Sequence, residues 1–309
     1  MGDCARRGCR LTVRFAVTVV VWCLATPGAH AQQQFQLYAS IVDGTGAPAA
    51  AIQPTDIRVM ENGVEAKIVK IENVSFPVKL QVLVDNGVGL GSEHIANLRN
   101  GVRALLEALP PGVEVTLVAT AGQPKFLVRP TTNRAAIMKG LGLLAPESGA
   151  GRFVEALLDA TARIEKDKGD YVPVIVAFAT TAGDVNVMER DGERLSKRIQ
   201  ARPTTVHVVL LSLIGARSAQ GGANQTEVGV GLTKMTGGRF ESIAAPNRIA
   251  TLLPEIGMQV AKAHERQTRQ FRVTAERPAG ASGELNKVSM AAFGGLEVAS
   301  LSLDGRVTN

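Results

Sequence analysis

The side chains best suited to chemistry stand directly after two strand-like segments of this chain. Asp85 follows the apolar segment 78–84, and a glycine-rich turn comes directly after it. Thr180 and Asp184 follow a second apolar segment, residues 172–179. Because open α/β sheets bind ligands at the carboxyl ends of their strands, these polar groups are expected to meet at one sheet edge.

Two carboxylates at one edge are suited to acid–base chemistry. Asp85 and Asp184 could act as the paired carboxylates of a hydrolase. The alternative interpretation is that the edge binds another protein and carries no chemistry of its own.

Other catalytic and cofactor signatures are absent from the sequence. Gly87, Gly89 and Gly91 give the spacing G-x-G-x-G, and Asp85 would repel a pyrophosphate, so no dinucleotide is expected. No phosphate loop, no Gly-x-Ser-x-Gly and no His-Glu-x-x-His motif occurs. His207 lies in a buried-strand pattern and is predicted to be a core residue. We therefore predict that the protein is not an enzyme and needs no organic cofactor.

The first 31 residues are predicted to be a cleavable signal peptide. Four arginines precede the apolar segment 15–25, and Ala29-His30-Ala31 has the small-x-small form of a cleavage site. A membrane anchor is the alternative, but this segment is well short of the roughly 20 residues that a spanning helix needs. Cleavage after Ala31 would place the protein in the periplasm or outside the cell.

Removing this leader changes the composition of the chain. All three cysteines and the single tryptophan lie within it, so the remaining chain has no disulfide and no thiolate metal site. The leader carries four arginines and one aspartate, so the formal net charge falls from +6 to +3. This charge does not favour a nucleic-acid partner. The basic run 262–277 is predicted to be a solvated helix end and strand face, so contact with a membrane surface is not expected.

Three parts follow the leader. Residues 32–75 and 267–309 alternate apolar and polar side chains at period two, which predicts short β-strands. Residues 76–266 alternate strands with helices, which predicts a doubly wound, mostly parallel sheet with helices on both faces. The predicted strands of this middle part are residues 78–84, 113–120, 125–128, 172–179, 205–213 and 239–242. The predicted helices are residues 93–109, 133–144, 152–168, 188–200, 227–235 and 247–263.

Two further expectations concern how the strands join. The segments 113–120 and 125–128 are separated by only four residues, so they are predicted to form a hairpin that adds one antiparallel edge strand to the sheet. The N-terminal and C-terminal segments each supply three strands. Because a three-stranded sheet alone is marginally stable, we expect the two to pack together as a small β accessory unit.

The order and spacing of these elements resemble a von Willebrand factor type A domain. Residues 56–65 (Asp-Ile-Arg-Val-Met-Glu-Asn-Gly-Val-Glu) and 232–240 (Leu-Thr-Lys-Met-Thr-Gly-Gly-Arg-Phe) more narrowly resemble the bacterial exported VWFA-related domain proteins. The resemblance covers nearly all of the chain after the leader. It implies a metal-ion-dependent adhesion site, built from Asp-x-Ser-x-Ser, a threonine on a second loop and an aspartate on a third.

This sequence departs from that ligand pattern at four of five positions. Asp85 matches the first aspartate, but Gly87 and Gly89 stand at the serines, Gly151 at the threonine and Thr181 at the second aspartate. A site with one carboxylate would hold Mg²⁺ weakly, so we expect the adhesion site to be degenerate and empty at physiological metal concentrations.

Arg152 and Asp184 leave alternatives open at this edge. The guanidinium of Arg152 could pair with Asp85 and replace the cation's charge, or it could point to solvent. Asp184 could substitute as a ligand and restore weak Mg²⁺ binding, which would make the domain a metal-dependent adhesion module.

The leading hypothesis is an exported, non-catalytic binding or scaffolding module. Its partner would be an envelope or extracellular protein held by loops at the carboxyl edge of the sheet. The predicted contact residues are Asp85, Asn86, Gly87, Gly89, Gly151, Arg152, Thr180, Thr181 and Asp184.

Overall fold

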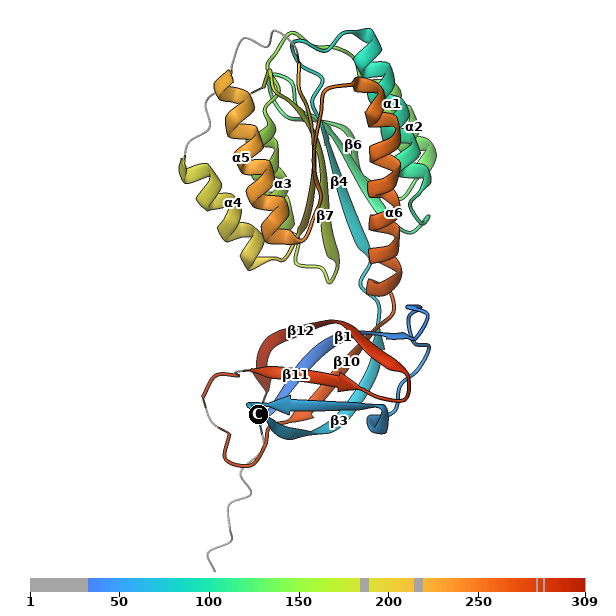
Figure 1. Cartoon of the computed structure of the whole chain (residues 1–309), viewed down its shortest axis with the longest axis vertical. Helices are drawn as coiled ribbons and strands as arrows, with labels where there is room; N and C mark the ends of the chain where they lie inside the picture. Colours follow the sequence, from blue (N-terminus) through green and yellow to red (C-terminus); the bar gives the residue numbers. More distant parts are fainter. Residues whose placement is uncertain (1–32, 184–188, 214–218, 282, 286, 309) are drawn as a thin grey trace, which may run out of the picture.

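The structure is a computed structural model in which residues 33–183, 189–213, 219–281, 283–285 and 287–308 are described. The predicted leader and Asp184 lie outside the described residues. The chain forms two units, an α/β unit and an all-β unit, which lie end to end (Figure 1).

The α/β unit is built on a six-stranded sheet with the order β6-β5-β4-β7-β8-β9. Every neighbouring pair is parallel except β5 and β6, which form the predicted antiparallel hairpin at one edge. Parallel order follows from the helical connections between strands. The strands are β4 (Val78–Val84), β5 (Glu114–Ala119), β6 (Lys125–Thr131), β7 (Val172–Thr180), β8 (Thr205–Leu211) and β9 (Phe240–Ile243).

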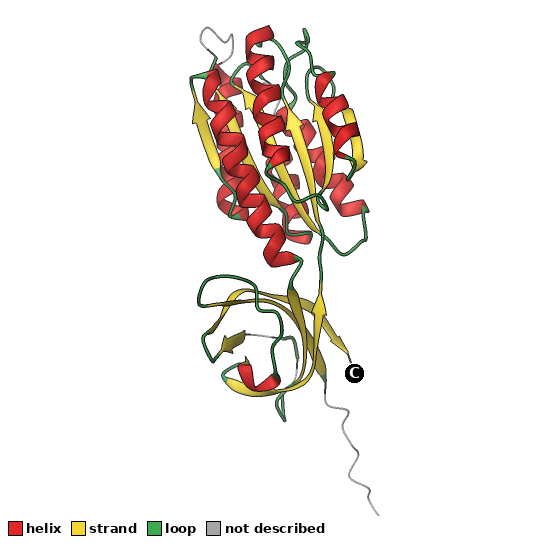
Figure 2. Ribbon diagram, turned by 90° about the vertical axis from the view of Figure 1, so that its right-hand side faces the viewer, coloured by secondary structure: helices red, strands yellow, loops and turns green. Residues whose placement is uncertain are grey.

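Helices cover both faces of this sheet (Figures 1 and 2). On one face lie α1 (Ser92–Glu107), α2 (Arg134–Gly142) and α6 (Ile249–Gln267), with the short 3-10 helix η2 (Pro246–Arg248) before α6. On the other lie α3 (Phe153–Lys166), α4 (Glu189–Ala201) and α5 (Ala219–Thr236). None of the described helices is long and apolar enough to cross a lipid bilayer.

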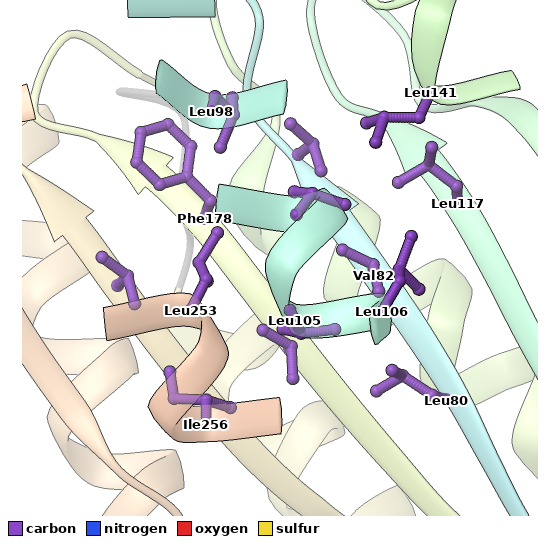
Figure 3. Packing of buried hydrophobic residues seen from close by; sticks show 14 of the residues in the cluster. Leu80, Val82, Leu98, Leu105, Leu106, Leu117, Leu141, Phe178, Leu253 and Ile256 are labelled. Carbon is purple, nitrogen blue, oxygen red and sulfur yellow. The ribbon is translucent and has the colours of Figure 1, made fainter. Parts of the chain in front are cut away.

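Period-two alternation along the strands builds two hydrophobic cores. Leu80 and Val82 of β4 pack toward α1 and α6, where Leu105 and Ile256 meet them (Figure 3). Leu83 points to the opposite face and joins the core under α3 and α4. Successive strand residues therefore supply apolar side chains to both faces, as expected for a parallel sheet that is covered on both sides.

Two glycines set the close approach of α1 and α6. A Cβ at Gly101 would lie 2.8 Å from the carbonyl oxygen of Ile249, and one at Gly257 would lie 2.7 Å from that of Leu105. Any larger residue at either position would push the helices apart, since packed interiors leave little free space.

The start of α5 differs from the sequence-based prediction. The helix begins at Ala219, eight residues before the predicted start at Glu227. The segment contains two adjacent glycines, which disfavour a helix by about 1 kcal/mol each and so indicated a loop. Tertiary packing outweighs this preference: Gln225 is buried, and Gly222 lies against the side chain of Thr181.

The β unit contains six strands from the two ends of the chain. They are β1 (Gln34–Asp43), β2 (Ile57–Glu61), β3 (Val64–Val74), β10 (Gln270–Glu276), β11 (Val288–Ala292) and β12 (Leu296–Thr308), with the 3-10 helix η1 (Pro54–Asp56) before β2. Their order, β11-β2-β3-β10-β1-β12, interleaves the two segments in one antiparallel sheet that curls until it nearly closes. The two segments thus form one β unit in which strands of each segment pair with strands of the other.

A buried ion pair lies inside this unit. Arg277 donates through Nε to both carboxylate oxygens of Glu61, at 3.0 and 3.1 Å, and through a second nitrogen to Gln33 and to the carbonyl of Gly283. The side chains of Glu61 and Arg277 are almost fully buried. The pair joins the strand segment before the α/β unit to the one after it.

A two-stranded ribbon connects the two units. The N–H of Phe76 donates to the carbonyl of Gln267 at 3.0 Å, which continues the pairing of β3 with β10. The rings of Tyr38 and Phe76 meet edge to face, with their centroids 5.1 Å apart. These contacts hold the β unit near the amino edge of the α/β sheet and leave the carboxyl edge at the far end.

His207 makes the stability of the α/β unit dependent on pH. As predicted, it is a core residue, and its Nδ1 accepts a hydrogen bond from the N–H of Arg239. Burial, and then the charge of Arg239, lower its pKa from 6.5 to about 4. The neutral ring therefore stabilises the fold fully above pH 6.5, and this contribution, about 3 kcal/mol, is lost as the pH falls toward 4.

His207→Asn tests this pH dependence, because asparagine keeps a hydrogen-bond acceptor but does not titrate. The free energy of unfolding should differ less between pH 7 and pH 4.5 in this variant than in the wild type. An unchanged difference would contradict the account.

Candidate functional site

Asp85 directly follows β4 at the carboxyl edge of the sheet and is nearly enclosed. Its backbone N–H donates to the carbonyl of Phe178 on β7. One carboxylate oxygen accepts from the N–H of Gly87 at 2.8 Å, and the other accepts from the hydroxyl of Thr180 at 2.7 Å. Only 2 % of the residue is exposed. Both oxygens are thus occupied by protein donors.

Burial dominates the electrostatics of this carboxyl group. It raises the pKa of Asp85 above its usual range, and the hydrogen bonds from Thr180 and Gly87 lower it only in part. No described cation forms an ion pair with Asp85, so nothing of opposite charge offsets the cost of burying the carboxylate.

Glycines make this enclosure possible. Gly151 lies directly over the carboxylate, and a Cβ at this position would overlap the carboxylate of Asp85. A Cβ at Gly87 would likewise overlap the carbonyl of Gly149. Gly89 has a φ of 87°, which a side chain would disfavour. The glycines at 87, 89 and 151 therefore lack ligand oxygens and also let the loops close on Asp85.

Backbone hydrogen bonds join three loops at the carboxyl edge: residues 85–91 after β4, residues 120–124 after β5, and residues 143–152 before α3. The N–H of Val88 donates to the carbonyl of Gly149, and that of Gly122 donates to the carbonyl of Ala150. A short antiparallel bridge joins Ala121 to Gly151. The edge is therefore a connected platform and not a set of independent loops.

Asn86 is part of this bracing. Its side-chain nitrogen donates to the carbonyl of Ala145 at 2.7 Å, and its side-chain oxygen accepts from the N–H of Ala121 at 3.3 Å. Its backbone carbonyl accepts from the N–H of Glu147 at 2.8 Å. Because Asn86 is also buried, it supports the platform from below and offers no surface to a partner.

Of the two arrangements left open for Arg152, the pair with Asp85 does not form. Arg152 precedes α3, and its Nε donates to the carbonyl of Gly122 at 3.2 Å and lies 4.0 Å from Glu155. Its side chain is partly exposed on the rim of the platform. The guanidinium of Arg152 is thus held near the carbonyl of Gly122, whereas Gly151, the preceding residue, covers the carboxylate of Asp85.

Thr180, and not Thr181, is the threonine that meets Asp85. Strand β7 continues through Thr180, so the next side chain faces away from the carboxylate. The hydroxyl of Thr181 instead accepts a hydrogen bond from the N–H of Leu213, after β8. Thr181, which stands at the position of the second aspartate in the adhesion-site pattern, therefore contacts the segment after β8 and not Asp85. Asp184, the remaining predicted contact residue, lies outside the described residues.

Two polar residues at this edge escaped the sequence analysis. Thr120 follows β5 as Asp85 follows β4, and its buried hydroxyl has no hydrogen-bond partner among the described residues. Its position directly after a strand could have identified Thr120 as a candidate site residue. Gln225 is buried against Gly183, but it comes from the part of α5 that the sequence indicated as a loop.

The described residues do not fit a divalent cation. Mg²⁺ needs several oxygen ligands in near-octahedral geometry, whereas Asp85 supplies a single carboxylate, which Gly151 covers and whose two oxygens each accept a hydrogen bond. The hydroxyl of Thr180 is directed at this carboxylate, and positions 87, 89 and 151 have no side-chain oxygen. Within the described part of the chain, no three His, Cys, Asp or Glu residues group together in a metal-binding arrangement.

Comparison with known proteins identifies the fold of the α/β unit. Residues 81–182 match the family model described as von Willebrand factor type A domain. A structure titled von Willebrand factor type A from Catenulispora acidiphila superposes with a TM-score of 0.50 at 11 % identity, over 89 % of this chain and 74 % of that chain. No curated protein matches this sequence.

A second similar structure is a pilus adhesin. SpaC from Lactobacillus rhamnosus GG, in its open conformation, superposes with a TM-score of 0.51 at 10 % identity, over 80 % of this chain and 47 % of that chain. At these identities the similarity shows the fold alone. The α/β unit therefore has the von Willebrand factor type A fold.

Proposed function

We propose that this von Willebrand factor type A fold serves as a metal-independent, non-catalytic module that binds a protein through the loops at its carboxyl edge. The enclosure of Asp85 under Gly151 is the observation that carries the proposal. It removes the carboxylate from metal chemistry and from general acid–base chemistry, because neither oxygen faces solvent.

The braced platform supports the binding role. Val88 is exposed, and so are Pro146 and Ser148 of the loop to which the N–H of Val88 donates. Cross-loop hydrogen bonds hold these residues in one arrangement before a partner arrives, which lowers the entropic cost of binding. Such a surface suits recognition by shape and apolar contact.

Charge pairing on the rim supports the same interpretation. Lys125 pairs with Glu147, and Arg152 lies near Glu155. Because these charges are already paired and partly exposed, they contribute little net attraction to a charged ligand. We therefore expect the affinity for the partner to depend only weakly on salt and to be unaffected by EDTA.

The predicted leader supports an envelope or extracellular location, where the partner would be found. Its arginines, apolar segment and Ala-His-Ala end are typical of exported proteins. The remaining chain, without cysteine, would fold in an oxidising compartment without forming disulfides.

Photo-crosslinking in the native host tests this proposal. A photoreactive amino acid at Val88 should give one discrete protein adduct that EDTA does not remove. The matched control carries the same group at Met258, which is more exposed than Val88 but lies within α6, away from the platform. No adduct at Val88, or the same adduct from both positions, would overturn the binding surface. An adduct lost in EDTA would overturn metal independence.

A further inference from the structure

A cleft of about 890 Å³ lies between the β unit and the amino edge of the α/β sheet. Residues 300–303 of β12 line it on one side, and the loops that lead into β7 and β8 line it on the other. In Figure 1, β12 lies on the side of the β unit that faces the α/β unit. The cleft is thus at the opposite end of the α/β unit from Asp85.

One edge of β12 has no partner strand. The strand pairs with β1 along its first edge, and among the described residues no strand pairs with its second edge. The segment that lines the cleft, residues 300–303 (Ser-Leu-Ser-Leu), carries no charge and no proline, two features that often protect an exposed edge. Its unpaired N–H and C=O groups therefore offer a template for another extended chain.

The core side of β12 is also uncovered where it lines the cleft. Leu301 and Leu303 stand opposite Ala39 and Leu37 of β1 and share their side of the sheet. Leu37 and Ala39 are fully buried, whereas Leu303 is 45 % exposed. A further strand beside β12 would shield this leucine as β10 shields the leucine of β1.

The charges on the opposite wall of the cleft indicate which side chains a strand added beside β12 would have. Arg202 stacks 4.2 Å over the ring of Tyr171 and donates to the carbonyls of Asp167 and Gly169, so its guanidinium is fixed in place by neutral acceptors. Lys168 lines the same wall, and Asp170 is the single acid among the described residues that line it. These lining side chains therefore carry one net positive charge, which favours an acidic ligand.

We propose that the free edge of β12 binds an extended, acidic peptide segment of a partner protein by β-strand addition. The peptide backbone pairs with residues 300–303. Apolar side chains at alternate positions cover Leu303, and acidic side chains face Arg202 and Lys168. This second site is independent of the platform at the carboxyl edge, so a single chain could hold two segments at once.

A labelled peptide tests the proposal. The probe is a fluorescein-labelled ten-residue peptide in which valine or leucine alternates with threonine or glutamate, and fluorescence anisotropy follows its binding to the purified protein. We expect saturable binding, weakened at least about tenfold by N-methylation of alternate backbone amides and by replacement of each glutamate with lysine. Hydrogen exchange should slow at residues 300–303 when the peptide is bound.

Matched variants locate the site. Leu303→Asp should weaken binding about tenfold or more, while Leu143→Asp, which places the same change on another exposed leucine, should leave it unchanged. Circular dichroism should be unaltered, because both leucines are exposed. Absence of binding, equal binding of the N-methylated peptide, or an unchanged affinity in Leu303→Asp would overturn the proposal. So would a wild-type dimer that Leu303→Asp converts to a monomer, because a second copy would then occupy the edge.

Discussion

Arg277→Met is expected to lower the free energy of unfolding of the β unit by about 3–5 kcal/mol. The substitution leaves Glu61 as a buried carboxylate without its cation, and breaking a buried pair on one side costs this much because the remaining charge is neither hydrated nor compensated. Arg277 also joins Gln33 to the loop at Gly283, so these contacts would be lost with it.

The two tyrosines of the chain allow this loss to be measured in one unit at a time. Tyr38 lies in the β unit and Tyr171 in the α/β unit. In a chain that begins at Gln32 and carries Tyr171→Phe, tyrosine fluorescence during guanidinium denaturation reports the β unit alone. The expected result is a large shift of the midpoint for Arg277→Met.

Two controls separate the buried charge from a general loss of arginine. Arg272→Met removes a pair with Glu72 that is partly exposed, so it should cost less than about 1 kcal/mol. The double variant Glu61→Leu with Arg277→Met leaves no buried charge and should recover much of the stability. Equal effects of Arg277→Met and Arg272→Met would contradict the account.

Gly151→Thr is expected to destabilise the α/β unit by about 3 kcal/mol. Its Cβ would overlap the carboxylate of Asp85, and overpacking of a closed site typically costs 1–3 kcal/mol, rising when backbone must move. The substitution also places a threonine where the adhesion-site pattern has one. It therefore tests whether this single change is enough to create a metal site.

The free energy of unfolding, measured with and without Mg²⁺, distinguishes an overpacked site from one that binds the metal. Gly112→Thr is the matched control, because a Cβ at Gly112 meets no atom within 4 Å. Adding Asp85→Ala to Gly151→Thr should relieve the overlap and recover stability, which a double-mutant cycle would measure as coupling. A Gly151→Thr protein that is as stable as wild type, or that Mg²⁺ stabilises, would show that the site has room for a metal.

Much of this architecture could be predicted from alternation of apolar residues. Apolar residues at every second position predicted β1 and β4, and apolar residues at helical spacing predicted α1. The buried face of each element repeats with the geometry of a strand or of a helix, so the sequence carries that period. The start of α5 could not be predicted in this way, since its glycines favour a loop locally and only contacts with Thr181 and the sheet make it helical. The interleaving of the β unit depends on pairing between distant segments, which local patterns do not encode.

The candidate site was predictable in position but not in detail. A polar residue after an apolar strand indicated where Asp85 would lie, whereas its enclosure depends on backbone that arrives from the second loop at Gly151. The choice between Thr180 and Thr181 depends on where β7 ends, and strand ends are the least certain part of a sequence-based assignment. Arg152 donates to a backbone carbonyl, that of Gly122, and no spacing rule specifies such a contact.

The central claim is that the carboxyl edge keeps the von Willebrand factor type A fold while Asp85 is closed to metal. Isothermal titration of the purified protein with Mg²⁺ and with Mn²⁺, beside Asp85→Ala, tests it most directly. We predict no saturable heat for either cation and the same trace for both proteins. Micromolar binding in the wild type that Asp85→Ala abolishes would contradict it.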